Sequence, residues 1–261
     1  MANALCYLET SFRRFPDRCA VTDDCRSYSY AEFYHLSRRI GTGLARLTGP
    51  KQGVGVFLEK NADAVAAFFG IQWAGCFYSV LNTELPGPRL NQIAAQLGPA
   101  VIVTCRELLA QAEEIFPGQR LVCLEELAEI PEDDAALAAI QARAIDTDPL
   151  YVNFTSGSTG VPKGIVVSSR SVLDFIGCFT ELFGITEGDV IANQAPFDFD
   201  VSVKDIYSAM KAGATLAVVP RRLFSVPTEL MDFLCEKKAT TLIWAVSALC
   251  LITGFHALDY R

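Results

Sequence analysis

The sequence is short of charge, of histidine and of paired cysteine, and each shortage excludes a class of protein. Only 20% of its 261 residues are charged and 51% are hydrophobic, which excludes an intrinsically disordered chain. The two histidines, His35 and His256, stand alone, and neither indicates a metal site or a nucleophilic triad. Acidic residues outnumber basic ones by 30 to 22, which disfavours nucleic acid or an anionic membrane as a partner.

Nine cysteines are scattered along the chain, and no two of them form a C-x-x-C pair. This pattern fits neither a disulfide framework nor a zinc site, so we expect reduced thiols, mostly in the core, in a cytoplasmic protein. The N-terminus has no signal-peptide pattern. The most apolar run, residues 64–81, contains Gln72 and two glycines, and it predicts a buried helix and strand instead of a membrane span.

Helical and extended patterns alternate along the chain, which predicts the α/β class. We expect two successive α/β units with mostly parallel sheets flanked by helices. The predicted subdomains are residues 1–124 and 150–261, joined by an acidic, solvated connector at 125–149. The predicted helices cover residues 30–47, 64–73, 89–97, 171–183 (capped by Ser171), 201–212, 228–238 and 246–253. The predicted strands cover residues 53–58, 76–81, 100–104, 121–123, 151–154, 165–167, 190–192, 215–219 and 241–245.

Residues 155–164, TSGSTGVPKG, combine four hydroxyl side chains, three glycines and one lysine. Glycine lets backbone N–H groups converge on an anion, and Lys163 adds a positive charge. The segment is not a Walker A loop, because no Ser or Thr follows the lysine directly. Pro162 and the apolar residues after Gly164 favour a strand–loop–strand hairpin. From composition alone, a plain glycine turn and a phosphate-binding loop both stay open.

The string TSGSTGVPKG closely resembles the signature loop of the adenylate-forming enzymes, the AMP-dependent synthetases and ligases. Residues 29–33 (SYAEF) and 70–78 (GIQWAGCFY) are similar to two further elements of that family, and the resemblance runs from about residue 10 to the end. It implies that a carboxylate attacks the α-phosphate of Mg-ATP and that a thiol, usually phosphopantetheine on a carrier protein, or CoA, then takes the acyl group. By the same resemblance, the ATP phosphates and the departing pyrophosphate are held by Thr155, Ser156, Gly157, Ser158, Thr159, Gly160 and Lys163. Thr155 and Lys163 would stabilise the leaving group in catalysis.

A second informative stretch, residues 197–207 (FDFDVSVKDIY), lies at the start of a predicted helix. Without a family, Asp200 is best interpreted as a helix cap. The stretch also resembles the F-D-x-S-V motif of amino-acid-activating members, whose aspartate pairs with the substrate α-ammonium. This motif assigns Phe199 and Asp200 to an amino acid substrate, although Asp198 could compete for the role. The longer match looks most like the D-alanine–carrier protein ligases.

Two further residues are candidates for the same pocket. Lys204 occupies a position that lines the side-chain pocket in the peptide-synthetase pattern, where it would meet an acidic substrate side chain. The alternative is a surface lysine bridging Asp200 or Asp205. D-alanine ligases usually have an apolar residue here, which weakens that sub-assignment. Trp244 could line the pocket or belong to the core.

The later motifs of the family are absent from the sequence, including its adenine-stacking tyrosine, most Mg²⁺ ligands and the C-terminal lysine. We therefore expect residues 1–261 to be the N-terminal part of an AMP-forming amino-acid ligase, inactive alone and in need of the missing C-terminal part. The alternatives are a non-catalytic binding module of the same fold and a fragment of an acyl-CoA synthetase.

Overall fold

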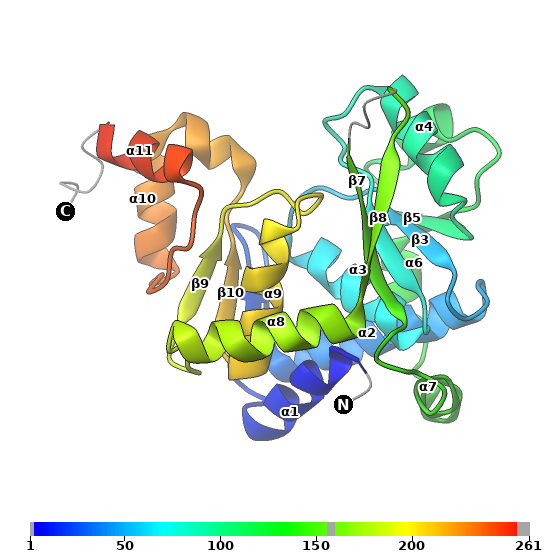
Figure 1. The fold of residues 1–261 in the computed structure, drawn as a ribbon, viewed down its shortest axis with the longest axis horizontal. Coiled ribbons are helices and arrows are strands. Elements are labelled where there is room, and N and C mark those ends of the chain that lie inside the picture. Colours follow the sequence, from blue (N-terminus) through cyan, green and yellow to red (C-terminus); the bar gives the residue numbers. More distant parts are fainter. Residues whose placement is uncertain (1–2, 156–159, 255–261) are drawn as a thin grey trace. The chain divides into compact units, whose positions relative to one another are not determined.

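The structure is a computed structural model, and it describes residues 3–155 and 160–254 (Figure 1). Helices and strands alternate, and the strands form two mostly parallel sheets, which confirms the predicted α/β class. The chain divides into two compact units that interleave along the sequence. The first unit takes its described residues from 1–6, 34–59 and 63–175, and the second takes them from 7–33, 60–62 and 176–261.

A six-stranded sheet forms the centre of the first unit, in the order β6-β5-β3-β4-β7-β8. Its strands are β3 (Gly53–Val56), β4 (Phe77–Val80), β5 (Val101–Thr104), β6 (Leu121–Cys123), β7 (Pro149–Thr155) and β8 (Lys163–Ser168). All pairings are parallel except that of the edge strand β8 with β7. Every residue of β3 and β5 is buried, as expected for parallel strands covered on both faces.

Two glycines let two helices of the first unit pack closely. The helices that lie wholly or mostly in this unit are α2 (Tyr30–Ala45), α3 (Ala62–Trp73), α4 (Gly87–Leu97), α5 (Leu109–Ile115), α6 (Leu124–Ala128) and α7 (Asp134–Gln141). A Cβ atom on Gly70 of α3 would lie 2.3 Å from the Ile40 side chain of α2, and one on Gly41 would lie 2.4 Å from Trp73. The two helices can therefore approach only because both positions lack a side chain.

A four-stranded sheet, in the order β2-β1-β10-β9, forms the centre of the second unit. Its strands are β1 (Cys19–Thr22), β2 (Ser27–Ser29), β9 (Val190–Asn193) and β10 (Thr215–Val218). Helices lying wholly or partly in this unit are α1 (Leu5–Arg14), α8 (Ser169–Leu182), α9 (Val201–Ala212), the 3₁₀-helix η1 (Arg221–Ser225), α10 (Pro227–Glu236) and α11 (Val246–Gly254). Helix α9 has the predicted bounds and ends at Gly213, whose φ of 76° is the left-handed conformation expected of a C-terminal glycine.

Three local predictions need correction. Residues 241–245 are not a strand, because only Thr241 forms an isolated bridge, to Ile191. Helix α8 begins at Ser169, and the Ser171 N–H donates to the Ser168 hydroxyl. Ser168 and not Ser171 therefore caps the helix. Local patterns also predict no element before residue 30, where α1, β1 and β2 lie, and they do not predict α5, α6 or α7.

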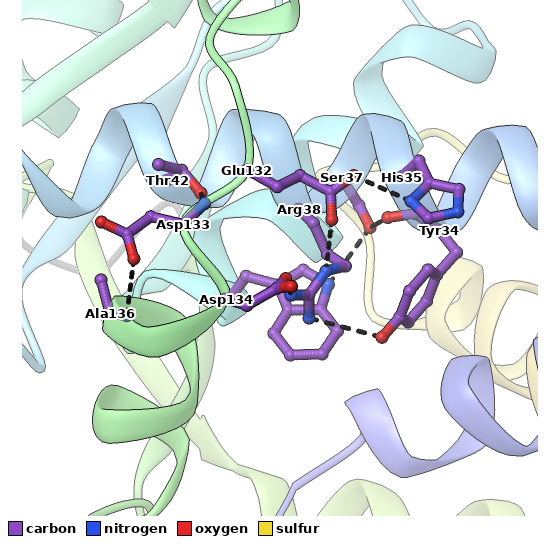
Figure 2. A network of polar contacts seen from close by, with 10 residues as sticks. Tyr34, His35, Ser37, Arg38, Thr42, Glu132, Asp133, Asp134 and Ala136 are labelled. Atoms are coloured by element: carbon purple, nitrogen blue, oxygen red, sulfur yellow. Dashed lines mark hydrogen bonds and ion pairs between the residues drawn. The ribbon is translucent and has the colours of Figure 1, made fainter.

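The predicted connector, residues 125–149, folds onto the first unit through α6, α7 and one arginine of α2. Leu127 and Leu137 are buried. Arg38 Nε donates to Glu132 Oε2 at 2.7 Å and Nη2 pairs with Asp134, as Figure 2 shows. The segment is therefore folded against α2 and is not a free linker, although much of it is exposed to solvent as predicted. The contiguous subdomains 1–124 and 150–261 also differ from the interleaved units, because local patterns carry no information on which distant strands pair.

The nine cysteines are all free, but only Cys76 and Cys123 are buried, and four are exposed. The expectation that most lie in the core is therefore wrong, because several fall on the outer faces of helices. In the described part of the chain, no helix is both long enough and apolar enough to cross a membrane.

Candidate functional site

The glycine-rich segment connects β7 to β8 as the predicted hairpin. The last register pair of the two strands is Thr155 opposite Lys163, and both side chains are exposed. Gly160 has a φ of 79°, which favours glycine. Ser156, Gly157, Ser158 and Thr159 lie outside the described residues. The hairpin thus brings the Thr155 hydroxyl and the Lys163 ammonium to the two ends of one short loop.

A second cation, which sequence reasoning missed, lies at the base of this loop. Arg89 of α4 donates from Nη1 to the Gly160 carbonyl and from Nη2 to the Thr155 carbonyl, both at 3.3 Å. The guanidinium therefore links the two ends of the loop and adds positive charge where Lys163 also lies. No local motif marks Arg89, because it is 66 residues from Thr155 in sequence.

The loop is also well placed by the topology of its sheet. Strand β7 runs parallel to β4, so Thr155 lies at the carboxyl end of a parallel strand. In open α/β sheets, ligands bind outside the carboxyl ends of the strands. The Thr155 hydroxyl and the two cations, Lys163 and Arg89, are suited to an oxyanion of high charge, such as a polyphosphate.

The second candidate segment follows the carboxyl end of β9 in the other unit. Residues 194–200 join β9 to α9, and Phe199 is 57% exposed at their end. Asp200 is also exposed, and it occupies the N-cap position of α9 but makes no side-chain capping hydrogen bond. The helix-cap interpretation of Asp200 therefore lacks the hydrogen bond that defines it. An exposed carboxylate beside an exposed aromatic ring can bind a cation carried on a small organic molecule.

Lys204 lies one turn into α9 and pairs with a carboxylate of its own helix. Its Nζ donates to Asp205 Oδ1 at 2.9 Å and to the Val201 carbonyl at 3.1 Å. Its side chain is 13% exposed and that of Asp205 only 1%, so the pair is not a surface bridge. Asp205 Oδ2 also accepts from the Asn193 amide at 2.9 Å. Burial raises the pKa of Asp205, and both partners oppose that shift by stabilising the carboxylate.

Trp244 lies in the hydrophobic core of the second unit. It is 8% exposed, and its Nε1 donates to the Ala192 carbonyl at 2.7 Å. Its ring also contacts Phe224 edge-on at 5.3 Å. Packing and one hydrogen bond account for this side chain, so its role in a substrate pocket stays a prediction.

One group of possible metal ligands exists among the described residues. Asp23, Asp24 and Cys25 bring three ligand atoms within 4.8 Å of one another in the β1–β2 turn. Asp23 already accepts hydrogen bonds from the N–H groups of Cys25, Arg26 and Ala62, which explains its place in the turn. The cluster is therefore accounted for by turn structure.

Comparison with known proteins adds three findings. A family model described as AMP-binding enzyme matches residues 8–257. The chain is 34% identical over 259 residues to phosphinothricin tripeptide synthetase PhsC of Streptomyces viridochromogenes, covering 95% of this chain and 23% of the synthetase. It is 28% identical over 222 residues to D-alanine–D-alanyl carrier protein ligase of Lacticaseibacillus casei, covering 85% of this chain and 43% of the ligase.

A solved structure has the same fold as this chain. The nonribosomal peptide synthetase FmoA3, with α-methyl-L-serine-AMP bound, superposes with a TM-score of 0.87 at 25% identity, covering 99% of this chain and 28% of that one. The chain therefore spans less than half the length of each of these proteins.

Proposed function

Since this chain belongs to the AMP-binding enzyme family, we propose that it supplies the phosphate loop and part of the acyl pocket of an amino-acid-activating ligase. The reaction is the ATP-dependent conversion of an amino acid carboxylate into an aminoacyl-adenylate, followed by transfer to a phosphopantetheine thiol on a carrier protein. The chain is homologous to amino-acid-activating domains of peptide synthetases and to carrier protein ligases, which supports the proposal.

In the first step, a carboxylate oxygen of the amino acid attacks the α-phosphorus of ATP. The new O–P bond replaces the bond between the α-phosphorus and the bridging oxygen, and pyrophosphate leaves with the electron pair. Lys163, Thr155 and the loop between them stabilise the charge that develops on the pyrophosphate. Arg89 keeps both ends of that loop in place. Bound Mg²⁺ would supply further charge neutralisation on the phosphates.

In the second step, the thiol sulfur attacks the acyl carbon of the adenylate and the carbon–oxygen bond to AMP breaks. AMP leaves with the electron pair, and the thiol proton is lost to water. The residues of this chain take part by holding the acyl portion, because Asp200 would pair with the α-ammonium and Phe199 would contact the substrate beside it.

One observation carries the choice of an amino acid over other carboxylic acids. Asp200 is exposed at the N-cap of α9 without a capping hydrogen bond, directly after the carboxyl end of β9 and its connecting segment. The carboxylate favours the helix dipole, but it makes no capping hydrogen bond and is therefore available to pair with an ammonium group. A fatty acid offers no cation for it to bind.

Pyrophosphate exchange by the complete gene product, with panels of amino acids and fatty acids, tests this function. We expect amino-acid-dependent exchange, and we expect Asp200→Asn to lower kcat/KM for the amino acid by about 100-fold, because the ion pair is lost. The matched control is Glu229→Gln, a first-turn carboxylate of α10 in the same unit, which should leave exchange unchanged. Fatty-acid-dependent exchange would point to an acyl-CoA synthetase, and no exchange with any acid would favour a binding module. We expect no exchange from residues 1–261 alone.

The nine free cysteines support a reducing compartment, and we propose the cytoplasm as the location of the protein.

A further inference from the structure

The Lys60 side chain joins the carboxyl ends of two neighbouring strands of the four-stranded sheet. Its Nζ donates to the carbonyl oxygens of Asn193 at 2.9 Å, Gln194 at 3.1 Å and Val219 at 2.9 Å. Asn193 ends β9 and Val219 directly follows β10. Three carbonyls use all three N–H donors of one ammonium group. Lys60 therefore holds the point at which residues 194–200 leave the sheet.

Lys60 is also part of a buried charged cluster around Asp205. The carboxylate accepts from Lys204 and from Asn193, each at 2.9 Å, and it attracts the Lys60 ammonium. Burial lowers the pKa of Lys60 to about 7, and Asp205 partly offsets that shift. Buried ions cost desolvation free energy that apolar side chains of the same volume would not. A contribution to folding stability alone therefore does not explain why this charged cluster is present.

The cluster fixes both ends of residues 194–200, which carry the predicted substrate contacts. Lys60 binds the backbone of Asn193, the Asn193 side chain binds Asp205, and Asp205 lies in the helix that begins just after Asp200. The segment is thus held at both ends, while Phe199 and Asp200 are exposed. Catalytic geometry is sensitive to displacements of about 1 Å, so such anchoring matters for a carboxylate that must meet an ammonium group.

We propose that Lys60 is a positioning residue of the amino-acid site, which fixes residues 194–200 so that Asp200 meets the substrate ammonium. The role of Asp200 in this statement rests on the proposed function, whereas the anchoring of residues 194–200 by Lys60 does not. No substrate contact is assigned to Lys60 itself.

Hydrogen exchange tests the anchoring in the complete gene product without any substrate. Lys60→Met should raise amide exchange in residues 194–205 by about tenfold while leaving β1 and α10 unchanged, because three hydrogen bonds that hold the start of the segment are lost. Lys60→Arg, which keeps donors for the carbonyls, should restore most of the protection. The matched control is Lys211→Met. Lys211 also donates to backbone carbonyls, of Gly177 and Ile176, in the same unit but away from this segment.

Pyrophosphate exchange kinetics then test the link to substrate. Lys60→Met should raise KM for the amino acid by about tenfold, with KM for ATP changed by less than about threefold, because the ATP phosphates are bound elsewhere. Lys60→Arg should return KM for the amino acid to near the wild-type value, and Lys211→Met should not raise it.

The two measurements can fail separately. If Lys60→Met raises exchange across the whole unit no differently from Lys211→Met, Lys60 is an ordinary structural lysine and the proposal is wrong. If residues 194–205 alone lose protection but KM for the amino acid is unchanged, the segment does not position the substrate. If the wild-type protein shows no pyrophosphate exchange with any amino acid, the proposed function fails. The hydrogen-exchange result then still decides whether Lys60 anchors residues 194–200.

Discussion

The β7–β8 hairpin and residues 193–205 present charged groups in opposite ways. In the hairpin, Thr155 and Lys163 are exposed, and Arg89 reaches the loop through two hydrogen bonds of 3.3 Å. In the other region, a buried carboxylate and two lysines fix the segment below an exposed Asp200. Under the proposed function the hairpin meets a polyphosphate, which carries several charges and many acceptors, whereas Asp200 meets an ammonium group. A single ammonium group needs one carboxylate in one place.

Lys163→Ala should have the largest effect, and it tests whether the β7–β8 hairpin binds the ATP phosphates. Removing the cation should lower kcat for pyrophosphate exchange by about 100-fold, because charge on the departing pyrophosphate is no longer stabilised. KM for the amino acid should stay near its wild-type value. The control is Lys51→Gln, an exposed lysine of the same unit that pairs with Asp148. A rise in KM for the amino acid with unchanged kcat would contradict the assignment of Lys163 to the phosphates.

Lys204→Met tests the buried pair of Lys204 and Asp205 in two ways. Asp205 loses its closest cation while remaining buried, so the free energy of unfolding should fall by about 3 kcal/mol, measured by urea titration. The second readout is the amino acid preferred in pyrophosphate exchange. A changed preference would support contact of Lys204 with an acidic substrate side chain, and an unchanged preference would leave Lys204 as the partner of Asp205 alone.

Arg89→Met should have a smaller effect, because Arg89 acts on the loop through its backbone. We expect KM for ATP to rise by about tenfold, because two hydrogen bonds from a charged donor are lost. Both bonds are exposed, so their combined loss should cost no more than about 1.5–3 kcal/mol. Arg89→Lys should recover part of the loss. Equal kinetics of Arg89→Met and the wild type would show that the loop keeps its conformation without this arginine.

The smallest expected effect is a pH dependence that belongs to the buried region. Burial lowers the pKa of Lys60 from 10.5 to about 7, so between these values the unfolded chain binds more protons than the folded one. Stability should therefore rise with pH in this window, by at most about 1.4 kcal/mol per pH unit. Lys60→Arg should lack this rise, because arginine stays charged. Urea titrations from pH 7 to pH 9 compare the two proteins, and parallel curves would show that Lys60 does not titrate there.

Sequence patterns predicted the hairpin and most elements after residue 30, because these depend on neighbours in the chain, but they did not predict α1, β1, β2, α5, α6 or α7. The run TSGSTGVPKG predicted a loop between two strands, and Gly213 ended α9 where expected. The contacts of Arg89 and Lys60 could not be predicted, because each residue reaches partners 66 or more residues away. The burial of Lys204 against Asp205 could not be predicted either: the sequence left a pocket lysine and a surface lysine both open, and local spacing does not show which neighbours cover a side chain.

The pairing of β1 with β10 also has a consequence for synthesis of the chain. Val21 of β1 lies opposite Leu216 of β10, so the two halves of this sheet are made far apart in time. At about 5–20 residues per second, the ribosome takes on the order of 10–40 s to reach β10 after β1. During that interval β1 and β2 lack the strand that completes their sheet, and a two-stranded hairpin is marginally stable by itself. Nascent chains of this protein should therefore depend on chaperones until β10 emerges.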